Sequence, residues 1–207
     1  IVGQLRALDF VKITGHVNNQ SGAIDNTFNG KVVINIFDKK LAKKPLINDG
    51  NFTPVLNDFE EGSPIVKASG TVTNGTFTVE FYMPKDINYT VGDGRILAYA
   101  DNNVFDVFNN KTYKVGDINP NGINDNEVPK VQLYLNNTNF VDGGITDSNP
   151  NLLACVTDNT GINSTGSGIG HDITVVLDGE VINTTVLNDF YTPGTGNGCI
   201  NASFLDY

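Results

Sequence analysis

The chain has 207 residues, and its 23 acidic side chains outnumber its 13 Lys and Arg side chains to give a formal net charge of -10. This balance excludes nucleic acid as a partner, because phosphate binding needs clustered Lys and Arg. No run approaches the roughly 18 apolar residues of a membrane span, so we expect no transmembrane segment. The length suits two ordinary domains. Because the chain opens with Ile1 and shows no signal peptide, we expect a processed or excised piece of a larger protein.

Alternating apolar and polar residues predict an antiparallel β-unit in the first half of the chain. The predicted strands are residues 11–17, 31–37, 65–73, 76–83 and 95–100. Asn74 and Gly75 separate two of these runs, and an Asn-Gly pair favours a two-residue hairpin turn. Residues 39–63 lack the alternation, so we expect connecting loops there.

A second series of predicted strands follows a stretch rich in Gly, Asn, Asp and Pro. The strands are residues 131–135, 152–157, 173–177 and 181–186, and Asp178-Gly179 is the strongest hairpin signal in the chain. The stretch 116–129 is the natural linker, with the domain boundary near Asn126. We therefore predict an all-β chain of two tandem Ig-like antiparallel β-sandwich domains, residues 1–126 and 127–207.

No complete catalytic centre is evident in the sequence. The available cysteine and histidine pairs combine Cys155 or Cys199 with His16 or His171. His16 belongs to the other predicted domain, and Cys155 lies in an apolar strand where a thiol behaves as a small hydrophobic group. We therefore expect no catalytic dyad. The two cysteines either stay free or, in an oxidising compartment, form one disulfide.

The linker holds the candidate metal site. Asp117, Asn119 and Asn121 are spaced two apart, as at the start of a calcium loop, and Asp125 offers a further carboxylate. The match fails where a calcium loop has its bidentate Glu, because Val128 stands there. An Asn-rich turn explains the same residues, so calcium and a plain turn both stay open. We expect no other cofactor.

Blocks of sequence along nearly the whole chain resemble one known family. They are ALDFVKITGHV at 7–17, GTFTVEFYMPKDINYTVGDGRILAYA at 75–100, the junction at 125–129, residues 150–163, GIGHDITVVLDG at 168–179 and VLNDFY at 186–191. In this order they resemble the region that follows the protease domain in gingipain-like cysteine peptidases, the PorU family of sortases of the bacterial type IX secretion system.

The resemblance implies a non-catalytic β-sandwich region of a cell-surface peptidase. Such a peptidase removes a C-terminal sorting domain from secreted cargo and transfers the cargo to anionic lipopolysaccharide. Its catalytic His and Cys would lie upstream of residue 1, so this chain alone would not be an enzyme. The expected location is the extracellular side of the outer membrane. The expected partners are the upstream peptidase domain, secreted cargo and other secretion components.

The same resemblance bears on the end of the chain. The family would continue past Tyr207 with a further strand, so the second sandwich either lacks its last strand or receives it in another way. An unpaired sheet edge readily pairs with another chain, so we expect an exposed edge there.

Two other functions stay open from the residues alone. A calcium-stiffened surface adhesion module would use Asp117, Asn119, Asn121 and Asp125 to fix the angle between the domains. A carbohydrate-binding module would need exposed aromatic platforms, and its candidates are Tyr89, Tyr99 and Tyr191.

Overall fold

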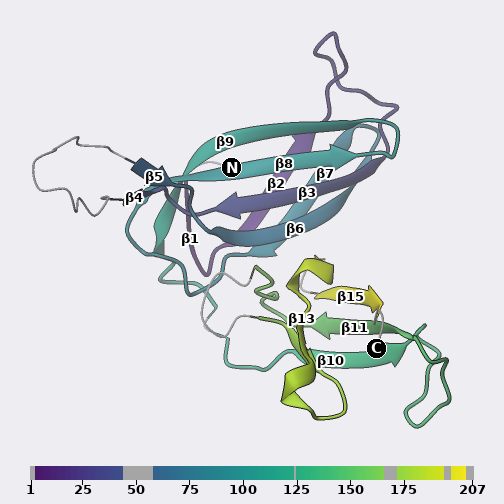
Figure 1. Ribbon diagram of the computed structural model, residues 1–207. Helices are drawn as coiled ribbons and strands as arrows, with labels where there is room; N and C mark the ends of the chain where they lie inside the picture. Colours follow the sequence, from purple (N-terminus) through teal and green to yellow (C-terminus); the bar gives the residue numbers. More distant parts are fainter. Residues whose placement is uncertain (1–2, 44–57, 124, 166–171, 194–196, 204–207) are drawn as a thin grey trace, which may run out of the picture.

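The computed structural model describes residues 3–43, 58–123, 125–165, 172–193 and 197–203. In these residues a seven-stranded sheet and a four-stranded sheet form the two main bodies, which Figure 1 shows one above the other. The prediction of an all-β chain is confirmed. The tandem Ig-like arrangement is not confirmed, because the larger sheet curls until it is nearly a barrel.

The larger sheet takes its strands from the first part of the chain. They are β1 (Gln4–Ala7), β2 (Phe10–His16), β3 (Gly30–Phe37), β6 (Pro64–Thr73), β7 (Thr76–Tyr82), β8 (Gly92–Asp101) and β9 (Asp106–Ile118), in the order β1-β9-β8-β3-β6-β7-β2. All neighbours are antiparallel except β1 and β9, which run parallel. The small pair β4 (Leu41–Lys43) and β5 (Asp58–Glu60) lies apart.

The core of the larger sheet follows from the alternation of side chains along its strands. Val32, Ile34 and Ile36 of the central strand β3 are fully buried, while their neighbours along the strand face outward. Phe28, also fully buried, meets Phe105 edge-on with ring centroids 5.3 Å apart. The predicted strands of this half therefore lie where the alternation placed them.

The hairpin between β6 and β7 has the tight turn that its sequence predicts. Asn74 and Gly75 have φ angles of 50° and 73°, so both lie in the left-handed region. A β-carbon on Gly75 would lie only 2.4 Å from the carbonyl oxygen of Asp25. The turn is thus packed against the loop that precedes β3.

We expect Gly75→Ala to lower the free energy of unfolding by about 1–3 kcal/mol, because alanine meets both a strained φ and this carbonyl. Urea denaturation checks the value, with Gly143→Ala as a matched control. Gly143 also has a positive φ but no atom near its missing β-carbon. Equal losses in both variants would show that the contact with Asp25 adds nothing.

The smaller sheet contains β10 (Lys130–Leu135), β11 (Asn151–Thr157), β15 (Asn197–Ser203) and β14 (Tyr191–Pro193), in that order. One face buries Leu152, Ala154, Ile200 and Ala202. The hairpin of β12 (Thr174–Val176) and β13 (Thr184–Val186) supplies Val175 to this cluster. The last described strand, β15, is an interior strand, so the edges of this sheet are β10 and β14.

A disulfide joins Cys155 and Cys199 on the opposite face of the smaller sheet. The two residues are direct partners in the ladder between β11 and β15. Cys155 is half-buried and Cys199 is exposed, so the bond lies outside the apolar cluster. It ties two strands whose positions in the chain are 44 residues apart.

The Asp178-Gly179 hairpin differs from its prediction. Both residues have positive φ, as predicted. The chain then forms a one-turn 3-10 helix, η1 (Val181–Asn183), before β13 begins, so the returning strand is shorter than residues 181–186. A second such turn, η2 (Asn188–Phe190), leads into β14. Among the described residues, no helix is long and apolar enough to cross a membrane.

Candidate functional site

The two sheets meet where β14 lies against β6. The Ser69 hydroxyl of β6 donates a hydrogen bond to the backbone carbonyl of Pro193 in β14. The Thr165 hydroxyl donates to the carbonyl of Ile65 at 3.4 Å. These contacts hold a loop and an edge strand of the smaller sheet against one strand of the larger sheet.

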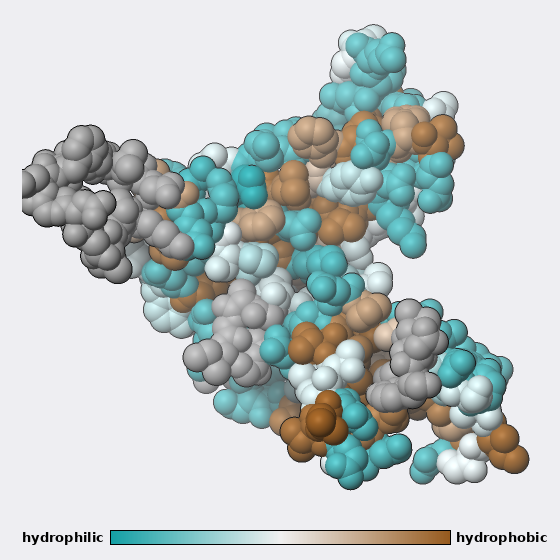
Figure 2. Space-filling model, in the orientation of Figure 1, coloured by the Kyte–Doolittle hydropathy of each residue, from teal (hydrophilic) through white to brown (hydrophobic). Residues whose placement is uncertain are grey.

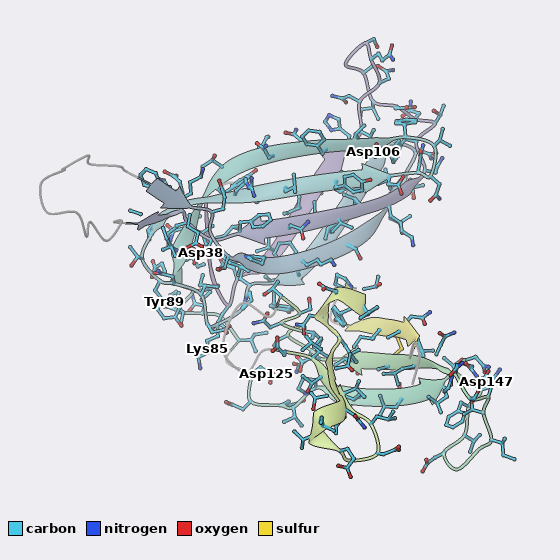
Figure 3. All side chains as sticks on the ribbon, viewed as in Figure 1. Asp38, Lys85, Tyr89, Asp106, Asp125 and Asp147 are labelled. Carbon is cyan, nitrogen blue, oxygen red and sulfur yellow. A yellow bond between two sulfur atoms is a disulfide. The ribbon has the colours of Figure 1, made fainter. Side chains whose placement is uncertain are left out.

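The linker adds a clasp at the same junction. Asp125 follows the larger sheet, and its Oδ2 accepts a hydrogen bond of 2.9 Å from the hydroxyl of Thr160, which follows β11. Its Oδ1 accepts a 2.8 Å bond from the backbone N–H of Glu127. Figure 3 shows Asp125 in the linker between the two bodies. One carboxylate thus ties the linker to itself and to the smaller sheet.

This arrangement makes the clasp sensitive to acid. The backbone N–H of Glu127, followed by the Thr160 hydroxyl, holds the pKa of Asp125 below its ordinary value. The ionised form is therefore favoured in the folded chain. The stabilisation is present above the pKa of the unfolded chain and is lost as pH falls through the lower folded value.

We expect the amide resonance of Glu127 to titrate with a midpoint below 3.8, the ordinary value for this carboxyl. NMR spectra recorded across acidic pH check this. Asp125→Asn keeps an acceptor oxygen but cannot titrate, so in that variant the transition of Glu127 should vanish. A Glu127 transition that persists in the variant would assign it to another carboxyl.

A cavity of about 240 Å³ lies beside these contacts. Its lining comes from both bodies and includes Ile65, Met83, Asp125, Ser164 and Tyr191. Ser164 is 5% exposed, and its hydroxyl has no hydrogen-bond partner. Burial raises the pKa of Tyr191 to about 12, so its phenol stays protonated at neutral pH.

Ser164 contributes to this cavity through both its side chain and its backbone. An ordinary serine hydroxyl needs a neighbouring base before it acts as a nucleophile. Ser164 instead uses its backbone carbonyl to accept a 3.1 Å bond from Asn188, which orders the loop. Across the described part of the chain, no group of three or more His, Cys, Asp or Glu is gathered closely enough to hold a metal ion.

The four predicted calcium ligands lie along the linker. Asp117 is the last residue but one of β9, and its Oδ1 accepts the N–H of Ile118. The side-chain oxygen of Asn119 accepts the N–H of Asn121. Asp125 makes the clasp described above. Calcium binding stays a prediction. Calorimetry with calcium or chelator tests it, because a cation that binds only the folded chain must raise Tm.

The two candidate cysteines lie in the smaller sheet, whereas His16 lies in the larger sheet. Cys155 and Cys199 are bonded to each other, so neither offers a thiolate. His16 ends β2 in the larger sheet, and His171 lies outside the described residues.

Of the three tyrosines considered as sugar platforms, Tyr191 is buried in the core of the smaller sheet, 3% exposed, and does not form one. Tyr89 and Tyr99 are 46% and 39% exposed.

Several residues at the junction could not be predicted from the sequence. Ser69 and Pro193 contact each other although they lie 124 positions apart in the chain. No local sequence pattern indicates such a pair. Thr160 has a weak signal, because the Asp158 carboxylate accepts its N–H in a local turn. That turn indicates local order, but it does not indicate the contact with Asp125.

Comparison with known proteins finds a similarity to a solved structure. No protein-family model matches the chain, and no curated protein matches it. Among solved structures, dimeric latent PorU from Porphyromonas gingivalis matches with 31% sequence identity and a TM-score of 0.55. The match covers 97% of this chain but only 19% of the PorU chain. It supports a PorU-like region, and this region corresponds to a small part of that protein.

Proposed function

We propose that the chain is a non-catalytic region of a PorU-like cell-surface cysteine peptidase, and that it acts as a rigid frame for the peptidase domain. The observation that carries the proposal is the match to PorU across 97% of the chain at 31% identity. A match of that extent involves both sheets and the linker.

The junction geometry suits a frame. Two bodies with separate cores meet through the Ser69–Pro193 and Asp125–Thr160 contacts, which restrict their relative movement. Rigid β-structures that present loops at their ends support recognition without chemistry of their own. The frame would orient the peptidase domain toward secreted cargo, while the catalytic His and Cys are supplied by that domain.

The disulfide supports a location outside the cytoplasm. Disulfides persist in oxidising compartments and are rare where thiols are kept reduced. The bond between Cys155 and Cys199 therefore suits a protein exposed at the cell surface.

The reading frame around this sequence tests the proposal. We expect it to encode a peptidase domain with a Cys and His pair before residue 1, and the whole polypeptide to release a C-terminal sorting domain from cargo. A frame that encodes only further β-sandwich repeats would contradict the proposal and favour an adhesion protein.

A further inference from the structure

The larger sheet is closed by hydrogen bonds along only part of its length. β1 pairs with β9 at Lys114, Val115 and Ile118, near the end of β9. Within the described residues, no strand pairs with this edge of β9 from Asp106 to Tyr113, and β2 pairs only with β7. Figure 1 shows β2 passing behind β8 and β9. The two strands thus border a gap in the hydrogen-bonded wall.

A cavity of about 520 Å³ lies between β2 and β9. Its lining includes residues 13–18, which contain the end of β2, and positions from Val107 to Tyr113 of β9. At the usual rise of a strand, this β9 wall is roughly 20 Å long. The volume falls within the range of about 300–1,000 Å³ that is typical of small-molecule sites. We call it the barrel cavity.

The barrel cavity reaches the apolar interior of the larger sheet. Its lining includes Val32, which is fully buried. Phe77 and Val107 also line it, and they pair directly with the buried Val72 and Ala100. Direct partners share a face of the sheet, so both side chains face inward. Both nevertheless stay partly exposed, which leaves apolar surface that a ligand would remove from water.

Lys111 supplies the charge at this opening. It pairs with the buried Ile96 of β8, so it leaves the strand on the inward face, and it is exposed. Among the residues that the structure describes, Lys111 forms no ion pair. The described lining of the cavity contains no Asp or Glu, although the chain has 23 of them. An anionic group would therefore meet a cation here without a carboxylate beside it.

We propose that the barrel cavity binds a straight-chain carboxylate, with its apolar chain against the interior and its carboxylate at the Nζ of Lys111. Largely apolar walls with a few polar groups are usual for ligand sites, and the mouths of barrels are a usual place for them. The length of the β9 wall suits a chain better than a compact ligand. The proposal goes beyond the proposed function and does not depend on it, because it needs only residues of the larger sheet.

Titration of decanoate into the chain of residues 1–207 at neutral pH tests the site. We expect saturable binding by calorimetry. In NMR spectra of the unaltered chain, the amide signals of Ala98, Val107 and Lys111 should shift together as decanoate is added. Decanol has the same apolar chain without the charge, so it separates the contribution of the interior from that of Lys111.

Two variants and one control divide the site into its parts. Lys111→Gln should weaken decanoate binding about threefold or more and leave decanol binding unchanged, since exposed ion pairs contribute modestly. Lys114→Gln is the matched control, because Lys114 lies on the outward face of the same strand, paired with Asp93. Ala98 lines the cavity and pairs with the buried Ile34. Ala98→Leu should therefore fill the interior and weaken both ligands by about tenfold.

The contrary results are distinct. An absence of saturable decanoate binding would overturn the site. Amide shifts confined to β10, where Val131 and Leu133 are exposed, would also overturn it, because they would show adsorption to the smaller sheet. Equal decanoate affinity in Lys111→Gln and the unaltered chain would overturn the contact with Lys111. None of these results involves peptidase activity, so each would leave the proposed function in place.

Discussion

Replacing Cys155 and Cys199 together by alanine should lower the free energy of unfolding of the smaller sheet by about 4 kcal/mol. The estimate follows from the loop-closure entropy of a cross-link between residues separated by 44 positions. The bond lies outside the apolar cluster, so its loss leaves the core of Leu152, Ile200 and their neighbours intact. The effect therefore comes mainly from greater freedom of the unfolded chain.

Guanidinium denaturation of the oxidised protein and the double variant measures the difference. The transition of the larger sheet should stay in place, because no residue of that sheet takes part in the bond. Asn201→Ala is the matched control, since Asn201 is exposed two positions beyond Cys199 on the same strand. A loss below about 1 kcal/mol in the double variant, or an equal loss in the control, would contradict a stabilising cross-link.

Ile34→Ala should cost the larger sheet about 2–5 kcal/mol. Ile34 is fully buried in the central strand β3, between the ladders to β6 and β8. Its truncation removes apolar contacts and leaves a cavity that the flanking strands close only partly. Because a cavity of about 520 Å³ already borders this residue, relaxation of the flanking strands would place the loss nearer the lower value.

Urea denaturation followed by amide signals from β3 and from β11 separates the two bodies. Lys31→Ala, at an exposed position of the same strand, should change stability by less than about 0.5 kcal/mol. If Ile34→Ala shifted the β11 transition as much as the β3 transition, the two sheets would unfold as one unit. That result would contradict the predicted division near Asn126.

Strands with regular alternation could be predicted from the sequence. Residues 31–37 and 76–83 have apolar side chains at every second position, and β3 and β7 lie there. Strand β9 was missed because its inward positions include Asn109 and Lys111, which interrupt the apolar pattern. Both polar residues line a cavity of about 520 Å³ between β9 and β2.

The larger sheet's closure is a second feature that local patterns do not show. The parallel pairing of β1 with β9 joins residues about 110 positions apart. The short sequence of β1 contains no pattern that identifies β9 as its partner strand. Without this pairing, the first five predicted strands are equally compatible with a sandwich. This explains why an Ig-like sandwich was predicted where the structure has a nearly closed sheet.

The smaller sheet contrasts with the larger one in how little of it is covered. Val131 and Leu133 of β10 are 57% and 60% exposed, although they pair with the buried Val156 and Ala154 of β11. Figure 2 shows apolar side chains on the surface of this body. Alternation alone predicts β10 correctly. It does not indicate that the β12–β13 hairpin leaves this edge strand uncovered.

Peptidase activity on cargo that carries a C-terminal sorting domain is the most direct test of the frame proposal. The longer polypeptide and the chain of residues 1–207 are assayed side by side, with release of the sorting domain followed by mass spectrometry. The proposal predicts release by the longer polypeptide and none by the chain alone. Release by the chain alone, or a longer polypeptide without a Cys and His peptidase domain, would contradict it.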